Sequence, residues 1–395
     1  MYVYSLYLHI PFCRHRCCYC DFNTYAGQED LIPAYVSALC REIELLAAAA
    51  DQPPQVGTVF FGGGTPSLLP AAHLQRILGS LDDHFELQSK AEITLEANPG
   101  TLSPGYLREL HSSGITRLSL GMQSANPDEL ALLERGHDYG DVANAVAWSR
   151  QAGFENLSLD LIFGLPYQTL YSWQQNLRLA VSLQPEHLSL YALTLEHGTP
   201  MQSWVAKGLL SEPDGDLAAE MYEWADEYLA ESGYPQYEIS NWAGSRRAGA
   251  DLRCRHNLQY WRNLPYLGLG AGAHGYAGGA RTANVLSPAA YIQRLQNGRA
   301  RQFPRTPATA NFQLIDKQTE MGETLMMGLR LTQEGVSKAA FKDRFGINLE
   351  EKYGREIREL QSIALLEWAG NDDDRLRLTS GGRLLGNQVF MRFIN

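Results

Sequence analysis

The sequence predicts an α/β fold: a partial (β/α)6 barrel followed by a small winged-helix-like α+β domain. Up to about residue 285, short β-rich segments alternate with helical segments, which is typical of βαβ units around a parallel sheet. The stretch 286–309 is rich in Pro, Gly, Arg and Gln, and beyond it helical segments precede a short hairpin. We therefore expect a barrel domain over residues 1–285, a linker over 286–309 and a smaller domain over 310–395.

Each element is predicted from hydrophobic periodicity. The expected barrel strands are Tyr4–Ile10, Thr58–Gly62, Glu92–Asn98, Arg117–Met122, Asn156–Phe163 and His187–Thr194. The expected barrel helices are Ile32–Ala49, Ala71–Phe85, Pro104–Ser113, Asp141–Ala152 and Thr169–Ser182. The C-terminal elements are helices Gln313–Leu331, Ser337–Phe345 and Leu349–Ile363, then hairpin strands Leu365–Trp368 and Leu376–Thr379 around a turn at Asn371–Asp374. Residues just after barrel strands gather at one face, where such folds build their sites.

The composition excludes several classes of protein. Hydrophobic residues make up 45% and charged residues 19%, as in a globular protein with a core. The 33 basic and 44 acidic residues give a net charge of −11, which argues against nucleic acid as a partner. The sequence contains no apolar run of about eighteen residues, so we expect no membrane span. Its first residues have a strand pattern rather than that of a signal peptide, and we expect a cytoplasmic protein.

Four of the six cysteines lie within eight residues near the N-terminus. Cys13, Cys17 and Cys20 have the spacing C-x3-C-x2-C. Three thiolates cannot complete a tetrahedral zinc site, but they can hold three irons of a 4Fe-4S cluster and leave the fourth iron open. The alternatives are a loop with incidental cysteines, or a zinc site completed by His9 or His15.

Glycine and polar residues follow several expected strands. A run of three glycines lies within Phe60–Ser67, where the absence of Cβ atoms lets backbone approach a ligand. Glu96 ends the third strand, and a carboxylate there can accept hydrogen bonds from ribose hydroxyls. Gln123 and Arg135 follow the fourth strand, and Asp160 lies in the fifth. Each alone could be a capping or salt-bridging residue, but their order at successive strand ends favours a site.

The C-x3-C-x2-C motif after an N-terminal strand, with an aromatic residue before its last cysteine, resembles the radical S-adenosylmethionine (SAM) superfamily. The resemblance implies that Cys13, Cys17 and Cys20 hold a 4Fe-4S cluster whose open iron is chelated by exchangeable SAM. It assigns no catalytic side chain. The residues implied to bind the cofactor are Tyr7, Tyr19, Gly62, Gly63, Gly64, Thr65, Glu96, Gln123, Arg135 and Asp160.

Further motifs are similar to one branch of that superfamily, which contains oxygen-independent coproporphyrinogen III oxidases and heme chaperones. They are YLHIPFC, GGGTPS, EANP, LSLGMQS, LDLIFGLP and HNLQYW with GLGAGAH, and they extend over nearly the whole chain. The oxidases have a fourth cysteine where this chain has Phe22, and an extension before a motif that here begins at Cys13. Both differences favour a heme chaperone over the alternative, an oxidase that decarboxylates propionates. A second alternative is a metal or thiol-redox module without SAM.

The segment HNLQYW, residues 256–261, resembles the HNxxYW motif of the heme chaperones and implies that His256 is an axial ligand of heme iron. Tyr260 and Trp261 could cover the porphyrin plane. The alternatives are a packed histidine, or a thiolate ligand from Cys254. We also expect Leu267–His274 to be a backbone-lined loop for SAM or substrate. The resemblance implies transfer of heme to an acceptor protein, with the cluster and SAM in regulatory or redox roles.

Overall fold

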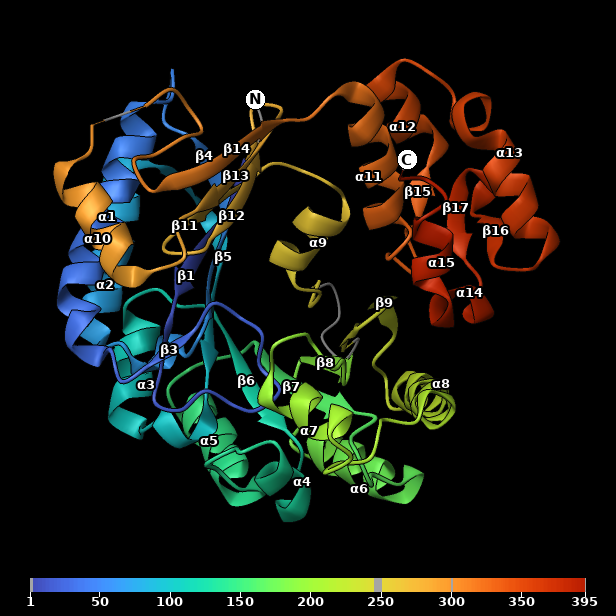
Figure 1. The fold of residues 1–395 in the computed structure, drawn as a ribbon, viewed down its shortest axis with the longest axis horizontal. Helices are drawn as coiled ribbons and strands as arrows, with labels where there is room; N and C mark the ends of the chain where they lie inside the picture. Colours follow the sequence, from blue (N-terminus) through green and yellow to red (C-terminus); the bar gives the residue numbers. More distant parts are fainter. Residues whose placement is uncertain (1–2, 245–250, 300, 395) are drawn as a thin grey trace. The chain divides into compact units, whose positions relative to one another are not determined.

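The computed structural model describes residues 3–244, 251–299 and 301–394. They form two compact units (Figure 1): residues up to Tyr228 with Pro265–Gln313, and Leu229–Leu264 with the residues from Leu314 onward. The predicted fold class, a partial β/α barrel and a smaller α+β domain, is confirmed. The sequence assigned Leu229–Leu264 to the barrel, whereas the compact units group it with the C-terminal residues. The expected domain boundaries stay a prediction.

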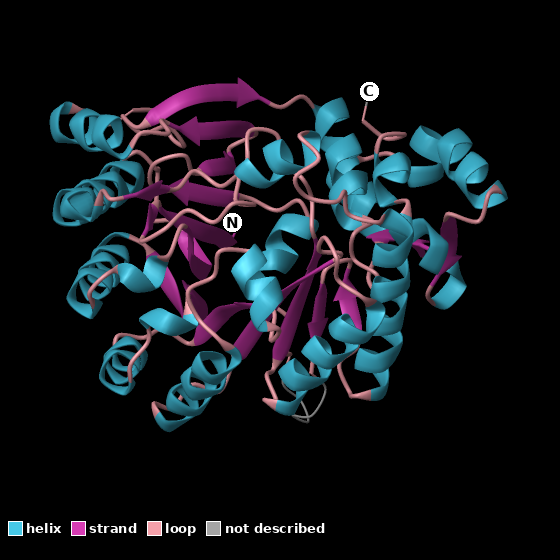
Figure 2. Ribbon diagram, turned by 60° about the horizontal axis from the view of Figure 1, so that its bottom comes forward, coloured by secondary structure: helices cyan, strands magenta, loops and turns pink. Residues whose placement is uncertain are grey.

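The first unit is built on a curved sheet with helices on its outer face (Figures 1 and 2). All six expected strands are present in the order β1-β4-β5-β6-β7-β8, and each neighbouring pair is parallel. This is the arrangement that repeated βα units produce. The bounds are β1 Val3–Ile10, β4 Gln55–Gly63, β5 Glu86–Ala97, β6 Arg117–Gln123, β7 Leu157–Phe163 and β8 His187–Ala192.

Several helices begin at residues whose side chains accept from the first backbone N–H groups, although α1 and α2 do not. Ser103 and Thr169 cap two of them, and Asp138 with Asp141 forms a capping box at a third. The bounds are α1 Ile32–Ala48, α2 Ala71–His84, α3 Pro104–Ser112, α4 Pro127–Leu132, α5 Tyr139–Gln151, α6 Leu170–Ser182, α7 Pro200–Ala206 and α8 Gly215–Glu231.

Beyond β1, the sheet continues through β11, β12, β13 and β14, with β11 parallel to β1. The bounds are β11 Tyr266–Leu269, β12 His274–Ala277, β13 Ala280–Asn284 and β14 Thr309–Leu314. The stretch expected to be a linker contains a helix, α10 (Pro288–Asn297), which packs on α1. Pro288 is compatible with a helix because it occupies the first turn, where Ser287 caps the chain.

A buried carboxylate connects the elements at this end of the sheet. Glu42 of α1 accepts hydrogen bonds from Gly270 N at 2.8 Å, Asn284 Nδ2 at 2.8 Å, Tyr291 OH at 2.6 Å and Thr306 Oγ1 at 2.7 Å. Burial raises its pKa, and these donors oppose that effect. The four contacts join α1 to α10, β13 and two loops.

The second unit contains a three-stranded antiparallel sheet in the order β15-β17-β16, packed with helices as in a winged-helix domain. Its first helix starts later than expected, at Lys317, because Asp316 caps it and the preceding residues form β14. The bounds are α11 Lys317–Gly328, β15 Val336–Ser337, α12 Lys338–Phe345, α13 Leu349–Ser362, β16 Leu366–Ala369, β17 Arg375–Leu378, α14 Ser380–Leu384 and α15 Gly386–Phe390.

The segment Leu229–Leu264 adds three elements to the second unit, β9 (Gln236–Glu238), β10 (Asn241–Ala243) and α9 (Arg255–Trp261). The helix α9 contacts α11.

In the described parts of the chain, none of the helices combines the length and the apolar character needed to cross a bilayer.

Candidate functional site

A cavity of about 620 Å³ lies at the carboxyl ends of the parallel strands in the first unit. Its wall brings together most of the site residues predicted from the sequence. They are Cys13, Cys17, Tyr19, Cys20, Gly63, Gly64, Thr65, Glu96, Gln123, Arg135 and Asp160. Tyr7 and Gly62 lie outside this lining, and His256 belongs to the second unit.

The three cysteines of the motif reach the cavity from one loop. Cys13 ends β2 (Phe12–Cys13), which pairs with β3 (Tyr25–Ala26), and Cys20 N donates to Cys17 O at 3.1 Å. The Thr65 hydroxyl donates to Cys13 Sγ at 3.6 Å. Burial raises the pKa of the Cys13 and Cys20 thiols. Thiols in such a place become thiolates when a positively charged metal group binds them.

Cys18 occupies a different environment from its neighbours. It is fully buried among Leu133, Ile162 and Met201, and its thiol donates to Leu132 O at 3.3 Å. Burial, followed by the charge of Glu134, raises its pKa to about 12. Cys18 therefore behaves as a packing residue in this structure.

The two histidines considered as zinc ligands have other partners. Both ring nitrogens of His9 are within hydrogen-bonding distance of other groups, Nδ1 at 3.0 Å from Tyr7 OH and Nε2 at 2.9 Å from Asn23 O. His15 Nε2 lies 3.0 Å from Glu134. Among the described residues, no group of three or more His, Cys, Asp or Glu side chains is arranged to hold a metal ion.

The glycine run at the end of β4 leaves no space for side chains. Gly63 has a φ of 111°, and a Cβ there would lie 2.5 Å from the His9 ring. A Cβ on Gly64 would lie 2.6 Å from Phe12 O and 3.0 Å from Cys13 Sγ. Glycine is required here because the backbone passes directly against the cysteine loop.

Two carboxyl groups face the cavity from neighbouring parts of the sheet. Glu96 accepts from Gly63 N at 3.2 Å, and Asp160 accepts from Ser119 Oγ at 2.9 and 3.1 Å. Burial, reinforced by the charge of Asp160, raises the pKa of Glu96 to about 7. Burial also raises the pKa of Asp160. Without a ligand, burial therefore disfavours the charged forms of both carboxyl groups. A ligand that donates hydrogen bonds to them would favour those charged forms.

Gln123 and Arg135 also line the cavity. Gln123 has a φ of 62°, unusual for a residue other than glycine, where the register of β6 against β7 shifts. Arg135 Nη2 donates to Gly121 O at 3.1 Å, and Nη1 lies 3.7 Å from Cys17 Sγ. Its Nε is buried and has no hydrogen-bond partner among the described residues. This guanidinium brings positive charge next to the thiols.

The sequence reasoning missed two aromatic side chains in the cavity wall as site residues. Phe22 is 62% exposed and Tyr191 is 45% exposed, although both line the cavity. Tyr191 pairs with Ile162 near the end of β8. Its place at a strand end was the signal that could have identified it.

The structure does not bring Leu267–His274 to the cavity, and its expected role as a loop for SAM or substrate stays a prediction. This loop is absent from the cavity lining, and its backbone N–H groups serve internal packing. Gly270 N donates to Glu42 at 2.8 Å, and Ala271 N donates to Tyr35 OH at 2.8 Å. The glycines permit these close approaches between backbone and buried side chains.

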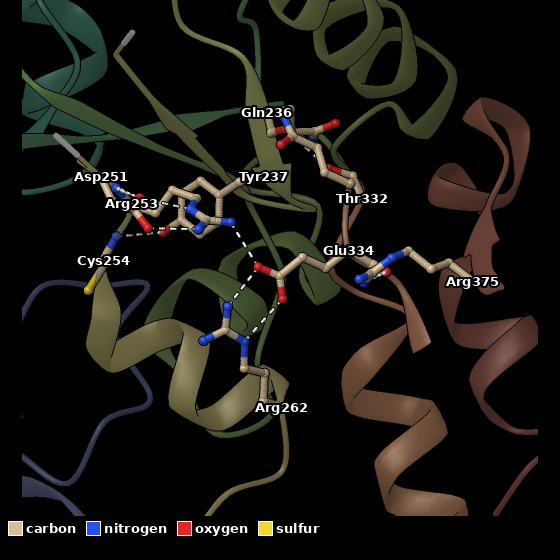
Figure 3. Close-up of polar contacts among 10 residues, drawn as sticks. Gln236, Tyr237, Asp251, Arg253, Cys254, Arg262, Thr332, Glu334 and Arg375 are labelled. Carbon is tan, nitrogen blue, oxygen red and sulfur yellow. Dashed lines mark hydrogen bonds and ion pairs between the residues drawn. The ribbon is translucent and has the colours of Figure 1, made fainter. Parts of the chain in front are cut away.

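The predicted heme ligand lies in α9 of the second unit. His256 is 1% exposed, and its Nε2 is 2.9 Å from Tyr260 OH. Cys254, just before α9, is also buried, and its N–H donates to Tyr237 OH at 3.3 Å (Figure 3). Ligation of iron by Nε2 would require exchange of the hydrogen bond to Tyr260.

One carboxylate holds both ends of α9, as Figure 3 shows. Glu334 accepts from Arg253 Nη1 at 2.8 Å, before the helix, and from Arg262 Nε at 3.0 Å and Nη2 at 2.7 Å, after it. Burial alone would raise the pKa of Glu334, but the arginines outweigh it and hold the pKa below its ordinary value. Arg375 Nη1 donates to the Glu334 carbonyl at 3.0 Å and fixes its backbone.

Comparison with known proteins gives matches over the whole chain. The family model of the radical SAM superfamily matches residues 7–180, and that of the HemN C-terminal domain matches residues 315–385. The heme chaperone HemW of Bacillus subtilis is 38% identical, with 99% of each chain covered. That of Mycobacterium tuberculosis is 39% identical, with 98% of this chain and 93% of the relative covered.

A solved structure, that of coproporphyrinogen III oxidase (HemN) from Escherichia coli, has the same fold. Its TM-score is 0.82 at 23% identity, covering 99% of this chain and 90% of the other. At this identity the likeness concerns the fold alone.

Glu96→Gln is expected to raise the free energy of unfolding of the cofactor-free protein by about 1 to 2 kcal/mol at pH 8, and by much less at pH 5. The folded-state pKa of about 7 exceeds the ordinary 4.5, so the folded protein binds more protons between these values and loses stability as pH rises. Glutamine keeps an acceptor for Gly63 N–H without the charge. Urea unfolding at both pH values measures the effect. An equal gain at pH 5 and pH 8 would contradict this electrostatic origin.

Proposed function

This chain belongs to the HemW family of heme chaperones, and we propose that it binds heme and transfers it to an acceptor protein. The observation that carries the proposal is identity of 38–39% to proteins named heme chaperone HemW, over nearly the full length of both chains. The described helices include no membrane span. The cytoplasmic location expected from the sequence stays a prediction, and so does the acceptor.

We further propose that Cys13, Cys17 and Cys20 hold a 4Fe-4S cluster. The donor set supports this, because three thiols share one cavity wall with a cationic side chain, Arg135. Gly64 supports it too, since any Cβ there would collide with the cysteine loop. Such a cluster, with one iron open to SAM, supplies one-electron chemistry when bound.

The other wall residues suit SAM, the second proposed cofactor. The backbone at Gly63–Thr65 can approach a ligand closely, while Glu96 and Asp160 can accept hydrogen bonds from hydroxyl or ammonium groups. Arg135 can donate to a carboxylate. Gln123 offers both an amide donor and an acceptor. Tyr7 and Gly62 pack against a residue of the cavity wall. A Cβ on Gly62 would lie 3.0 Å from the Tyr7 ring and 3.1 Å from Glu96.

The main alternative is oxidation of coproporphyrinogen III. The shared fold with the Escherichia coli oxidase is compatible with it. Phe22 argues against it, because the resemblance associates the oxidases with a cysteine at that position. The second alternative, a thiol-redox module without SAM, leaves the carboxyl groups and Arg135 in the cavity wall without a role.

Replacing Cys13, Cys17 or Cys20 by alanine is expected to abolish most cluster loading, because each removes one of three iron ligands. Cys18→Ala is the matched control: the same atom is deleted within the same loop, but from the apolar cluster outside the cavity. Anaerobic reconstitution with iron and sulfide, followed by iron analysis and visible absorption, measures the loading. Full loading of Cys17→Ala, or loss of loading only in Cys18→Ala, would overturn the ligand assignment.

Anaerobic incubation with coproporphyrinogen III, SAM and a strong reductant is expected to leave the porphyrinogen unchanged. The reason is the phenylalanine at position 22. Chromatography of the porphyrins after oxidation measures conversion, and an authentic oxidase serves as positive control. Protoporphyrinogen formed over many turnovers would make the oxidase the preferred function.

The purified protein is expected to bind heme, and His256→Ala is expected to weaken that binding or to shift the Soret band, because an imidazole bond to iron is lost. Burial of the porphyrin keeps part of the affinity. Titration with heme, monitored by absorption, gives both the dissociation constant and the spectrum. Cys254→Ala is the control for thiolate ligation. If His256→Ala matches the wild type in both measurements, His256 is a packing residue.

A further inference from the structure

Arg330, two residues beyond α11, makes cation–π contacts with two aromatic rings. Its Cζ lies 5.2 Å from the centroid of the Trp261 ring and 4.7 Å from that of Phe390. Its carbonyl oxygen accepts from Ile239 N at 3.1 Å, which fixes the backbone below the side chain. Cation–π contacts of this kind orient a planar guanidinium but leave its in-plane N–H donors unused.

Among the described residues, those donors have no acceptor. Across the described residues, the Arg330 guanidinium makes neither a hydrogen bond nor a salt bridge, and its Nε is buried without a partner. The side chain is half-buried, so its charge is only partly solvated. Burial lowers the pKa of Arg330 despite the nearby carboxyl of Glu238, and burial also raises the pKa of Glu238 to about 7. A partly protonated Glu238 cannot fully neutralise the cation.

One of these two aromatic partners, Trp261, belongs to the proposed heme motif. Trp261 is the last residue of α9 and of HNLQYW, and its Nε1 is likewise buried without a partner among the described residues. Five residues separate it from His256, about 7.5 Å along a helix axis. Trp261 and the Arg330 that contacts it therefore belong to the same region of the second unit as His256.

We propose that Arg330 is a carboxylate-binding residue that receives a propionate of heme beside the HNxxYW motif. This inference rests on the proposed heme chaperone function. A carboxylate fits because a guanidinium offers paired donors that match its two oxygens. An anion would also compensate the half-buried charge, which the surrounding protein leaves largely uncompensated.

The test compares heme with heme dimethyl ester, in which both propionates lose their charge. The wild type is expected to bind heme about 10- to 100-fold more tightly than the diester, the range for hydrogen bonds to a charged group. Arg330→Gln is expected to lose most of this preference while binding the diester as the wild type does. Arg330→Lys keeps the charge without the paired donors and is expected to keep part of the preference.

Arg355→Gln is the matched control, because it removes a positive charge from an exposed position on α13 of the same unit. Its preference for heme over the diester is expected to equal that of the wild type. An unchanged preference in Arg330→Gln would overturn the proposal, as would equal binding of heme and diester by the wild type even if Arg330→Gln fails to fold. A wild type that binds neither compound would instead contradict the chaperone function itself.

Discussion

The parallel register of the six barrel strands is the constraint on which the cavity depends. Because every strand runs in the same direction, the residues that follow them meet at one edge. Glu96 lies opposite Ser119, and Ser119 lies opposite Ser158, so the Ser119 hydroxyl can reach Asp160. A slip of one residue in any strand would turn these side chains to the helix-covered face. The site is therefore a consequence of strand pairing rather than of any single loop.

Gathering buried ionisable side chains in one cavity wall has an electrostatic cost. The cofactor-free wall contains two carboxyls and two thiols whose ionised forms burial disfavours. It also contains the Arg135 guanidinium, whose Nε has no hydrogen-bond partner in the described part of the chain. Such an arrangement stabilises the fold less than apolar side chains of the same volume would. Proteins retain costly groups of this kind at sites where a ligand completes them. The cavity is thus preorganised for a ligand with both donors and anionic groups.

Much of the barrel could be predicted from the sequence because each βα unit is encoded locally. Hydrophobic periodicity identified the six strands and five of the helices, with all ends within about three residues except the start of β5. The residues of the cavity wall followed from strand ends and the resemblance. The sequence could not reveal contacts between residues that lie far apart in the chain. The glycine loop at Gly270 serves Glu42, which lies 228 residues earlier in the sequence, and no local pattern reveals that partner.

The second unit contrasts two ways of using arginine. Arg253 and Arg262 share Glu334, and Arg253 also pairs with Asp251, so their charges are compensated within the protein and serve to hold α9 at both ends. Arg330 has aromatic rings in place of a carboxylate, so its orientation is fixed while its charge and donors stay available. An acidic side chain in place of Trp261 or Phe390 could form an ion pair with Arg330, whereas the aromatic rings cannot. A helix beside an oriented cation whose donors have no acceptor among the described residues suits the proposed binding of an anionic planar ligand.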